Sequence, residues 1–113
     1  MSLNIRHLGP DFAVTGQIAL QDLPEVAALG FGTVINNRPD GEAGDQPPSD
    51  EVERAARAAG LRYVHLPVVS GAITPEQGRA MREALASAHG PVLAFCRSGA
   101  RSGKLYELAQ SAA

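Results

Sequence analysis

One stretch near the C-terminus decides the fold: Pro91-Val92-Leu93-Ala94-Phe95-Cys96-Arg97-Ser98-Gly99-Ala100-Arg101-Ser102. The apolar run indicates a buried strand, and the polar residues after Cys96 predict a tight turn that opens a helix. Backbone N–H groups of such a turn and the positive end of a helix dipole favour negative charge. Together with Arg101, they are expected to lower the pKa of the Cys96 thiol and make it nucleophilic. The alternative is a core cysteine that closes a buried strand, but the arginines, serines and glycine that follow favour the first interpretation.

Outward from this stretch, predicted strands and helices alternate. Strands are expected over residues 12–17, 31–36, 61–68 and 91–95, and helices over residues 22–30, 50–59, 74–88 and 100 to about 112. Helices between successive strands imply parallel pairing with right-handed crossovers. The sequence therefore predicts an α/β fold, a three-layer sandwich with a mostly parallel central sheet of about four strands.

Two helix starts carry recognisable capping chemistry. Thr74 precedes Pro75, a residue suited to the first helical position, and Gln77 can complete a capping box with Thr74. Ser49 is the expected cap of the helix that begins near Asp50. Because active sites of parallel sheets lie at the carboxyl ends of the strands, the turn over 36–40 and the loop over 67–71 should gather beside Cys96.

Composition limits the functional classes. The 113 residues, predicted to form one domain over 1–113, are 44% hydrophobic and carry a formal net charge of −2, which argues against nucleic-acid binding by bulk charge. A single cysteine excludes an internal disulfide, and no apolar run is long enough to cross a membrane. A cytoplasmic location is therefore expected. No metal site is predicted, because metal-ligand spacing is lacking for the three histidines His7, His65 and His89. The oligomeric state does not follow from the sequence.

The Cys96 loop resembles the thiolate loops of two families. Protein tyrosine and dual-specificity phosphatases place five residues between the cysteine and an arginine, whereas four residues, 97–100, separate Cys96 from Arg101 here. On that resemblance Cys96 is the nucleophile, Gly99 allows close approach, Arg101 binds the oxyanion and Ser102 supplies the hydroxyl that follows it. Rhodanese-type sulfurtransferases carry loops of the shorter length, often reading Cys-Arg-Ser-Gly-x-Arg. A tighter ring of amides suits a persulfide sulfur better than a tetrahedral phosphoryl group.

Nearly the whole chain resembles a small bacterial phosphatase-like family of unknown function, number 442, whose domain also occurs beside metallo-β-lactamase-like sulfur enzymes. The resemblance rests on residues 15–18, 33–42 and 63–68 together with the Cys96 loop. It implies a protein tyrosine phosphatase-like fold and a cysteine-dependent hydrolase that acts on a phosphate ester through a phosphocysteine, without a metal or organic cofactor. The expected partner is a small anionic substrate or a phosphoprotein.

The resemblance at the Cys96 loop and the position of the turn over 36–40 together give the expected site residues. The expected catalytic residues are Cys96, Arg101, Ser102 and Asp40, and the expected substrate-binding residues are Arg38, Arg97, Ser98, Gly99 and Ala100.

One departure from the phosphatase pattern concerns the general acid. Such phosphatases carry an aspartate on a loop before the cysteine, but residues 66–71 contain no carboxylate. Asp40 is the best substitute, although aspartate in an Arg-Pro-Asp-Gly sequence is also a common turn former. His65 is a poorer substitute, because its strand position favours burial. Two other functions stay open: sulfur transfer through a Cys96 persulfide, and a catalytically silent module that binds an anion or phosphoprotein.

Overall fold

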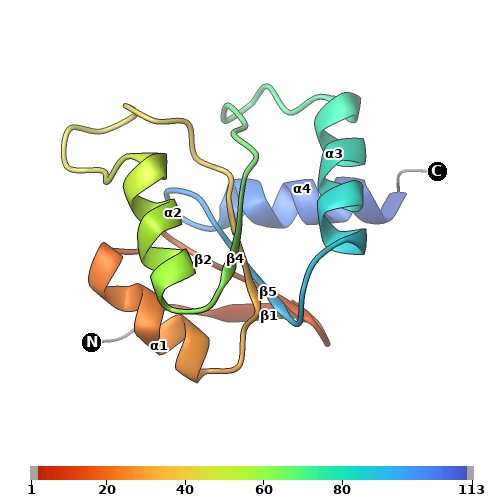
Figure 1. Cartoon of the computed structure of the whole chain (residues 1–113). Helices are drawn as coiled ribbons and strands as arrows, with labels where there is room; N and C mark the ends of the chain where they lie inside the picture. Colours follow the sequence, from red (N-terminus) through yellow and green to blue (C-terminus); the bar gives the residue numbers. More distant parts are fainter. Residues whose placement is uncertain (1–2, 112–113) are drawn as a thin grey trace.

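The computed structural model describes residues 3–111. Helices cover both faces of a central sheet (Figure 1). The elements in chain order are β1 (Arg6–Gly9), β2 (Phe12–Thr15), the 3-10 helix η1 (Leu20–Asp22), α1 (Leu23–Ala28), β3 (Thr33–Asn36), α2 (Ser49–Ala58), β4 (Arg62–His65), α3 (Pro75–Ala86), β5 (Val92–Phe95) and α4 (Ala100–Ser111). The predicted end of the last helix, Ala112, lies outside the described residues.

The sheet has the strand order β1-β2-β5-β3-β4. The pairs β2–β5, β5–β3 and β3–β4 are parallel, and β1 pairs antiparallel with β2. The mostly parallel α/β sheet is therefore confirmed. The strand that carries Cys96 at its end, β5, lies between two parallel neighbours.

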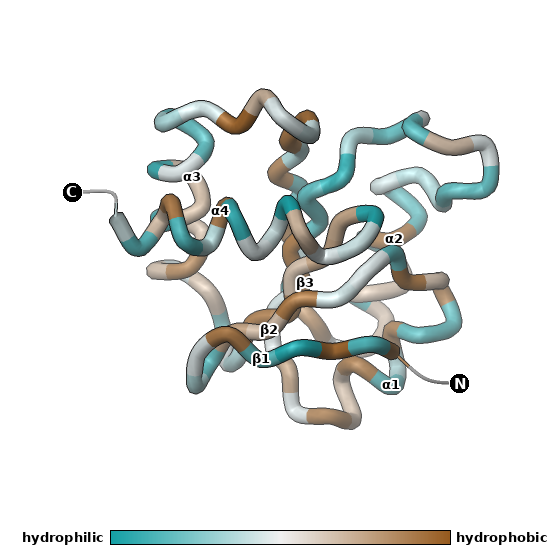
Figure 2. Tube along the Cα trace, turned by 180° about the vertical axis from the view of Figure 1, so that it is seen from behind, coloured by the Kyte–Doolittle hydropathy of each residue, from teal (hydrophilic) through white to brown (hydrophobic). Residues whose placement is uncertain are grey.

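The sheet has five strands, not about four. The additional strand, β1, is a short edge strand whose first three residues are exposed. Hydrophilic residues interrupt it (Figure 2). Because one polar edge strand needs neither an apolar run nor alternating hydrophobicity, its sequence carries little strand signal.

The core has two halves, one on each face of the sheet. Along β5, Leu93 and Phe95 pack into the half that contains residues of α1 and α2, whereas Val92 and Ala94 pack into the half that contains residues of α3 and α4. Successive side chains of a strand point to opposite faces, so a continuous apolar run fits a strand covered on both sides. This packing forms the predicted three layers.

The two predicted helix starts differ in outcome. At α3 the capping box is confirmed, because Gln77 N–H donates to Thr74 Oγ1 over 3.2 Å and Thr74 N–H donates to Gln77 Oε1 over 2.9 Å. At α2 the cap position is Pro48, so the assignment of Ser49 as the cap is wrong. Ser49 N–H instead donates to Asp40 Oδ1 over 2.8 Å. No helix within residues 3–111 is long and apolar enough to cross a membrane.

Candidate active site

Cys96 follows the last residue of β5 and lies at the carboxyl edge of the parallel strands. The preceding residue, Phe95, pairs with Thr15 of β2 on one side and with Asn36 of β3 on the other. The segments that leave β2 and β3 therefore flank the cysteine, as the topology predicts. The side chain of Cys96 is fully buried.

The turn between Cys96 and α4 is fixed by glycine and by its neighbour β2. Gly99 has φ +93°, a conformation that side chains rarely adopt, and its N–H donates to Cys96 Sγ over 3.1 Å. Gly16 lies against the turn so closely that a Cβ at this position would be 3.0 Å from the Arg97 carbonyl oxygen. That carbonyl accepts a hydrogen bond from Gln17 N–H over 3.2 Å. The segment after β2 thus holds the carbonyl of Arg97.

Opposing effects act on the Cys96 thiol. Burial is the largest influence and raises its pKa, but hydrogen bonds from the backbone N–H groups of Ser102, Ser98 and Gly99 and from the Ser102 hydroxyl together outweigh burial. The pKa of Cys96 therefore lies below the ordinary thiol value. A larger thiolate fraction at neutral pH follows.

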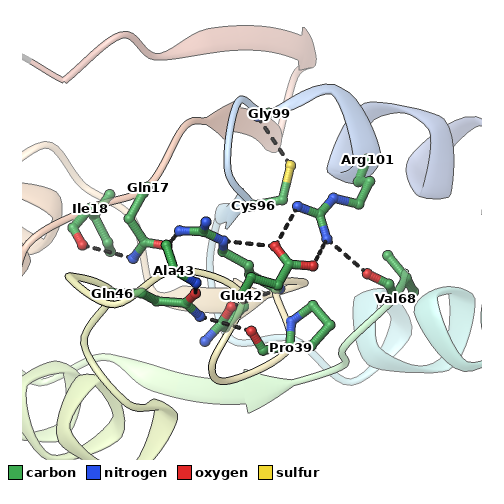
Figure 3. A network of polar contacts seen from close by, with 12 residues as sticks. Gln17, Ile18, Pro39, Glu42, Ala43, Gln46, Val68, Cys96, Gly99 and Arg101 are labelled. Carbon is green, nitrogen blue, oxygen red and sulfur yellow. Dashed lines mark hydrogen bonds and ion pairs between the residues drawn. The ribbon is translucent and has the colours of Figure 1, made fainter. Parts of the chain in front are cut away.

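Glu42 is the main partner of Arg101. Arg101 Nη1 donates to Glu42 Oε2 over 2.7 Å, and Nη2 donates to Oε1 over 2.9 Å. Figure 3 shows this carboxylate turned toward the Arg101 guanidinium, close to Cys96 and Gly99. The hydrogen bond from Arg101 is the main reason that the pKa of Glu42 falls to about 2, with burial opposing and Arg38 contributing further.

These contacts orient the guanidinium of Arg101. The outer edge, formed by Nη1 and Nη2, faces Glu42, and the second hydrogen of Nη1 is used by the carbonyl oxygen of Val68 over 3.0 Å. Neither the Glu42 contacts nor the Val68 contact uses the Nε hydrogen or the second Nη2 hydrogen. These two hydrogens lie on the same edge of the guanidinium, a geometry suited to a bidentate oxyanion. The pKa of Arg101 is raised chiefly by Glu42 and to a smaller extent by Cys96.

The same carboxylate binds Arg38. Arg38 Nε donates to Glu42 Oε1 over 2.9 Å, and its Nη1 donates to Gln17 Oε1 over 2.9 Å. The side chain of Arg38 is 6% exposed, so these two partners hold it nearly buried. Glu42 thus links the two arginines at the site.

Ser102 and Asn37 form a buried pair next to Cys96. The Ser102 hydroxyl donates to Asn37 Oδ1 over 2.8 Å, and Asn37 Nδ2 donates to the Leu66 carbonyl oxygen over 2.9 Å. The Leu66 contact fixes which end of the Asn37 amide faces Ser102. The Ser102 hydroxyl is also one of the groups that lower the pKa of the Cys96 thiol.

Asp40 lies at the start of α2. Its Oδ1 accepts from Ser49 N–H, and the Ser49 hydroxyl lies 2.6 Å from the Tyr63 hydroxyl. His65 Nε2 lies 3.0 Å from the Arg38 carbonyl oxygen. Asp40 and His65, the two side chains considered as proton donors, are therefore both hydrogen-bonded to backbone groups, and these contacts support the turn after β3.

A cavity of about 850 Å³ opens at this site, and we call it the site cavity. It is lined by Gln17, Arg38, Glu42, Ala43, Asp45, Gln46, Ser70, Arg97, Ser98, Ala100 and Arg101. Five predicted site residues are among them: Arg38, Arg97, Ser98, Ala100 and Arg101. Within the described part of the chain, Asp40 is not one of the lining residues, and neither are the buried Cys96, Gly99 and Ser102.

Sequence analysis missed Glu42 and the further lining residues Gln17, Ala43, Asp45, Gln46 and Ser70, most of which lie with Glu42 in the loop after β3. This loop is mostly hydrophilic (Figure 2), which is typical of any solvated connection. The signal that could have identified Glu42 is indirect: Arg101 and Arg38 at a buried strand edge need a counter-charge, and few acidic residues flank the predicted turn. In residues 3–111 no group of three or more histidine, cysteine, aspartate or glutamate side chains could hold a metal ion.

Comparisons with known proteins agree on the family and the fold. The family described as beta-lactamase hydrolase-like protein, phosphatase-like domain, matches residues 4–113. A beta-lactamase hydrolase-like protein of Agrobacterium fabrum is 41% identical over 98 residues, which is 87% of this chain but 23% of the relative. The chain thus spans about a quarter of the length of such curated relatives.

Solved structures share the architecture. A Neisseria meningitidis protein provisionally assigned as a phosphatase has a TM-score of 0.86 and 30% identity, covering 93% of this chain and 75% of that chain. Pseudomonas aeruginosa TpbA, crystallised with phosphotyrosine, has a TM-score of 0.68 and 19% identity, covering 90% of this chain and 59% of that chain. The protein tyrosine phosphatase-like fold is confirmed by these neighbours.

Proposed function

Because the chain belongs to the phosphatase-like domain family of the beta-lactamase hydrolase-like proteins, we propose that it is a cysteine-dependent hydrolase of a small anionic phosphate ester. The observation that carries the proposal is the Cys96 thiol, whose pKa is lowered by hydrogen bonds from the turn that begins α4. Arg101 lies beside this thiol. Its contacts with Glu42 and Val68 do not use the guanidinium edge formed by Nε and Nη2, which can bind an oxyanion.

The reaction we propose has two steps. The Cys96 thiolate attacks phosphorus, an S–P bond forms and the ester P–O bond breaks, while Arg101 and the turn N–H groups hold the equatorial oxygens. Water then attacks the phosphocysteine, the S–P bond breaks, and inorganic phosphate and the thiolate are released. Ser102 can assist the second step, because its hydroxyl can donate to the departing thiolate.

The leaving oxygen of an unactivated ester needs a proton. Asp40 was the expected donor, but its Oδ1 is engaged by Ser49 N–H at the start of α2, and it does not line the site cavity. This position favours a structural role for Asp40. The first substrate tested should therefore be 4-nitrophenyl phosphate, whose leaving group departs as a stable anion.

The test compares purified protein with two variants. Wild-type protein is expected to release 4-nitrophenolate, Cys96→Ser to lose the activity, and Arg101→Lys to retain little of it, because lysine cannot reproduce the planar fork. Arg6→Ala, which changes an exposed arginine of β1, is the matched control and should retain full activity. No turnover by the wild-type protein would contradict the hydrolase proposal, and phosphate binding without either hydrolysis or sulfur transfer would leave an anion-binding module.

Sulfur transfer is the second candidate, and the four-residue interval between Cys96 and Arg101 favours it. In that reaction the thiolate attacks the outer sulfur of thiosulfate, a persulfide forms and sulfite leaves. Cyanide then takes the sulfur as thiocyanate and regenerates the thiolate. Thiocyanate formation, together with a persulfide on Cys96 by mass spectrometry and no hydrolysis of the aryl phosphate, would replace the first proposal by this one.

A further inference from the structure

Polar and apolar atoms share the lining of the site cavity about equally, but no aromatic residue from 3–111 lines it. The aromatic side chains lie elsewhere: Phe95 is in the core, Phe12 stacks on Tyr106, Phe31 stacks on His7, and Tyr63 bonds Ser49 and Asn36. An aromatic leaving group would therefore find no stacking partner in this cavity.

Hydrogen-bonding groups also line the cavity. Ser70 contributes a hydroxyl, whereas the amides of Gln17 and Gln46 are already bonded at both ends within the protein. Asp45 also lines the cavity, and among the described residues no arginine or lysine is paired with its carboxylate. A carboxylate of this kind accepts hydrogen bonds from hydroxyl groups. Ser70 and Asp45 thus offer hydrogen-bonding positions to a ligand that carries hydroxyl groups.

Arg97 adds a cation that the proposed chemistry does not use. It is exposed and lines the cavity directly after the nucleophile position. Arg38 and Arg101 share the carboxylate of Glu42, whereas in residues 3–111 no acidic side chain forms an ion pair with Arg97. A guanidinium without a protein counter-charge at the mouth of an anion site is placed to bind a second anionic group of the ligand.

From these contacts we infer that the substrate is a small hydroxylated compound that carries a second anionic group, such as a sugar bisphosphate, rather than an aryl phosphate. This inference rests on the proposed phosphatase function. The scissile phosphate lies on Cys96 and Arg101, the second phosphate contacts Arg97, and the hydroxyl groups bond polar groups of the cavity lining. Phenyl phosphate, an aryl ester with no second anionic group, gains neither the second charge contact nor a stacking partner.

The experiment measures binding without chemistry, since aryl and alkyl esters differ in intrinsic reactivity. The Cys96→Ser variant is titrated calorimetrically with fructose 1,6-bisphosphate, fructose 6-phosphate and phenyl phosphate. The bisphosphate should bind roughly tenfold or more tightly than either monophosphate, the gain expected for one added charge-assisted contact. Adding Arg97→Ala should reduce bisphosphate affinity to that of the monophosphate, whereas adding Arg6→Ala should not.

Two results would overturn the inference. If the inference is right, phenyl phosphate binds more weakly than the bisphosphate, so equal or tighter binding of phenyl phosphate contradicts it. An Arg97→Ala effect of the same size on all three ligands contradicts a second anion contact. The proposed function fails separately, if the wild-type protein hydrolyses no phosphate ester, including 4-nitrophenyl phosphate.

Discussion

At Cys96, burial and hydrogen bonding act on the thiol pKa in opposite directions, and hydrogen bonding prevails. Ser102 contributes twice, through its backbone N–H and through its hydroxyl, whereas Ser98 contributes through its backbone N–H. The hydroxyl contribution can be removed without changing the turn. Residue 102 is therefore the position at which the thiol can be tuned by a single substitution.

Replacing Ser102 by alanine should raise the pKa of Cys96, because the hydroxyl is one of the groups that lower it. The pH dependence of thiolate absorbance in the ultraviolet measures it. Ser98→Ala is the matched control and should leave the pKa in place, since the backbone N–H of residue 98 remains. Equal shifts in both variants would mean that the hydroxyl has no special role.

Glu42 is the residue through which pH should act on stability. Because its pKa is about 2 in the folded chain against 4.5 ordinarily, its ion pairs stabilise the fold above pH 4.5 and lose that effect as the pH falls toward 2. Glu42→Gln should therefore be less stable than wild type in urea at neutral pH, and the difference should shrink on acidification through this window. A difference that is constant with pH would contradict a charged Glu42 in the folded state.

At the scale of elements, Asp40 joins the turn after β3 to α2. Asp40→Ala should lower the free energy of unfolding by about 1 kcal/mol, since Ser49 N–H loses its acceptor at the helix start. Asp40→Asn keeps an oxygen that can accept, so stability and the pH profile for phenyl phosphate hydrolysis should both stay close to wild type. Loss of the alkaline limb of that profile in Asp40→Asn would instead restore Asp40 as the proton donor.

The parallel strands and most helix positions could be predicted because their information is local. The apolar run of β5 and the Thr74 capping box can each be recognised from a few consecutive residues. The edge strand β1 could not be predicted, because pairing with β2 demands little of its side chains. Glu42 could not be predicted either, since Arg101, its partner, lies 59 residues away along the chain and only the folded sheet brings them together.

At the scale of the whole molecule, the site exists only when the sheet is formed. Its parts come from three segments: the one after β2 with Gln17, the one after β3 with Arg38 and Glu42, and the turn that carries Cys96 and Arg101. No one of these segments can bind an oxyanion with this geometry alone. A ligand of the site must therefore bind the folded chain and not the unfolded one, which couples anion binding to folding.

Inorganic phosphate should consequently stabilise the protein against unfolding. At a free concentration about one hundred times its Kd, the free energy of unfolding should rise by about 2.7 kcal/mol. Thermal or urea unfolding with and without phosphate measures this, with sodium chloride at equal ionic strength as the control for general salt effects. Arg101→Ala should abolish the stabilisation, because the guanidinium fork beside Cys96 is removed, whereas Arg6→Ala should keep it. Equal stabilisation by sodium chloride, or by phosphate in Arg101→Ala, would show that the phosphate acts elsewhere on the surface and not at the carboxyl edge of the sheet.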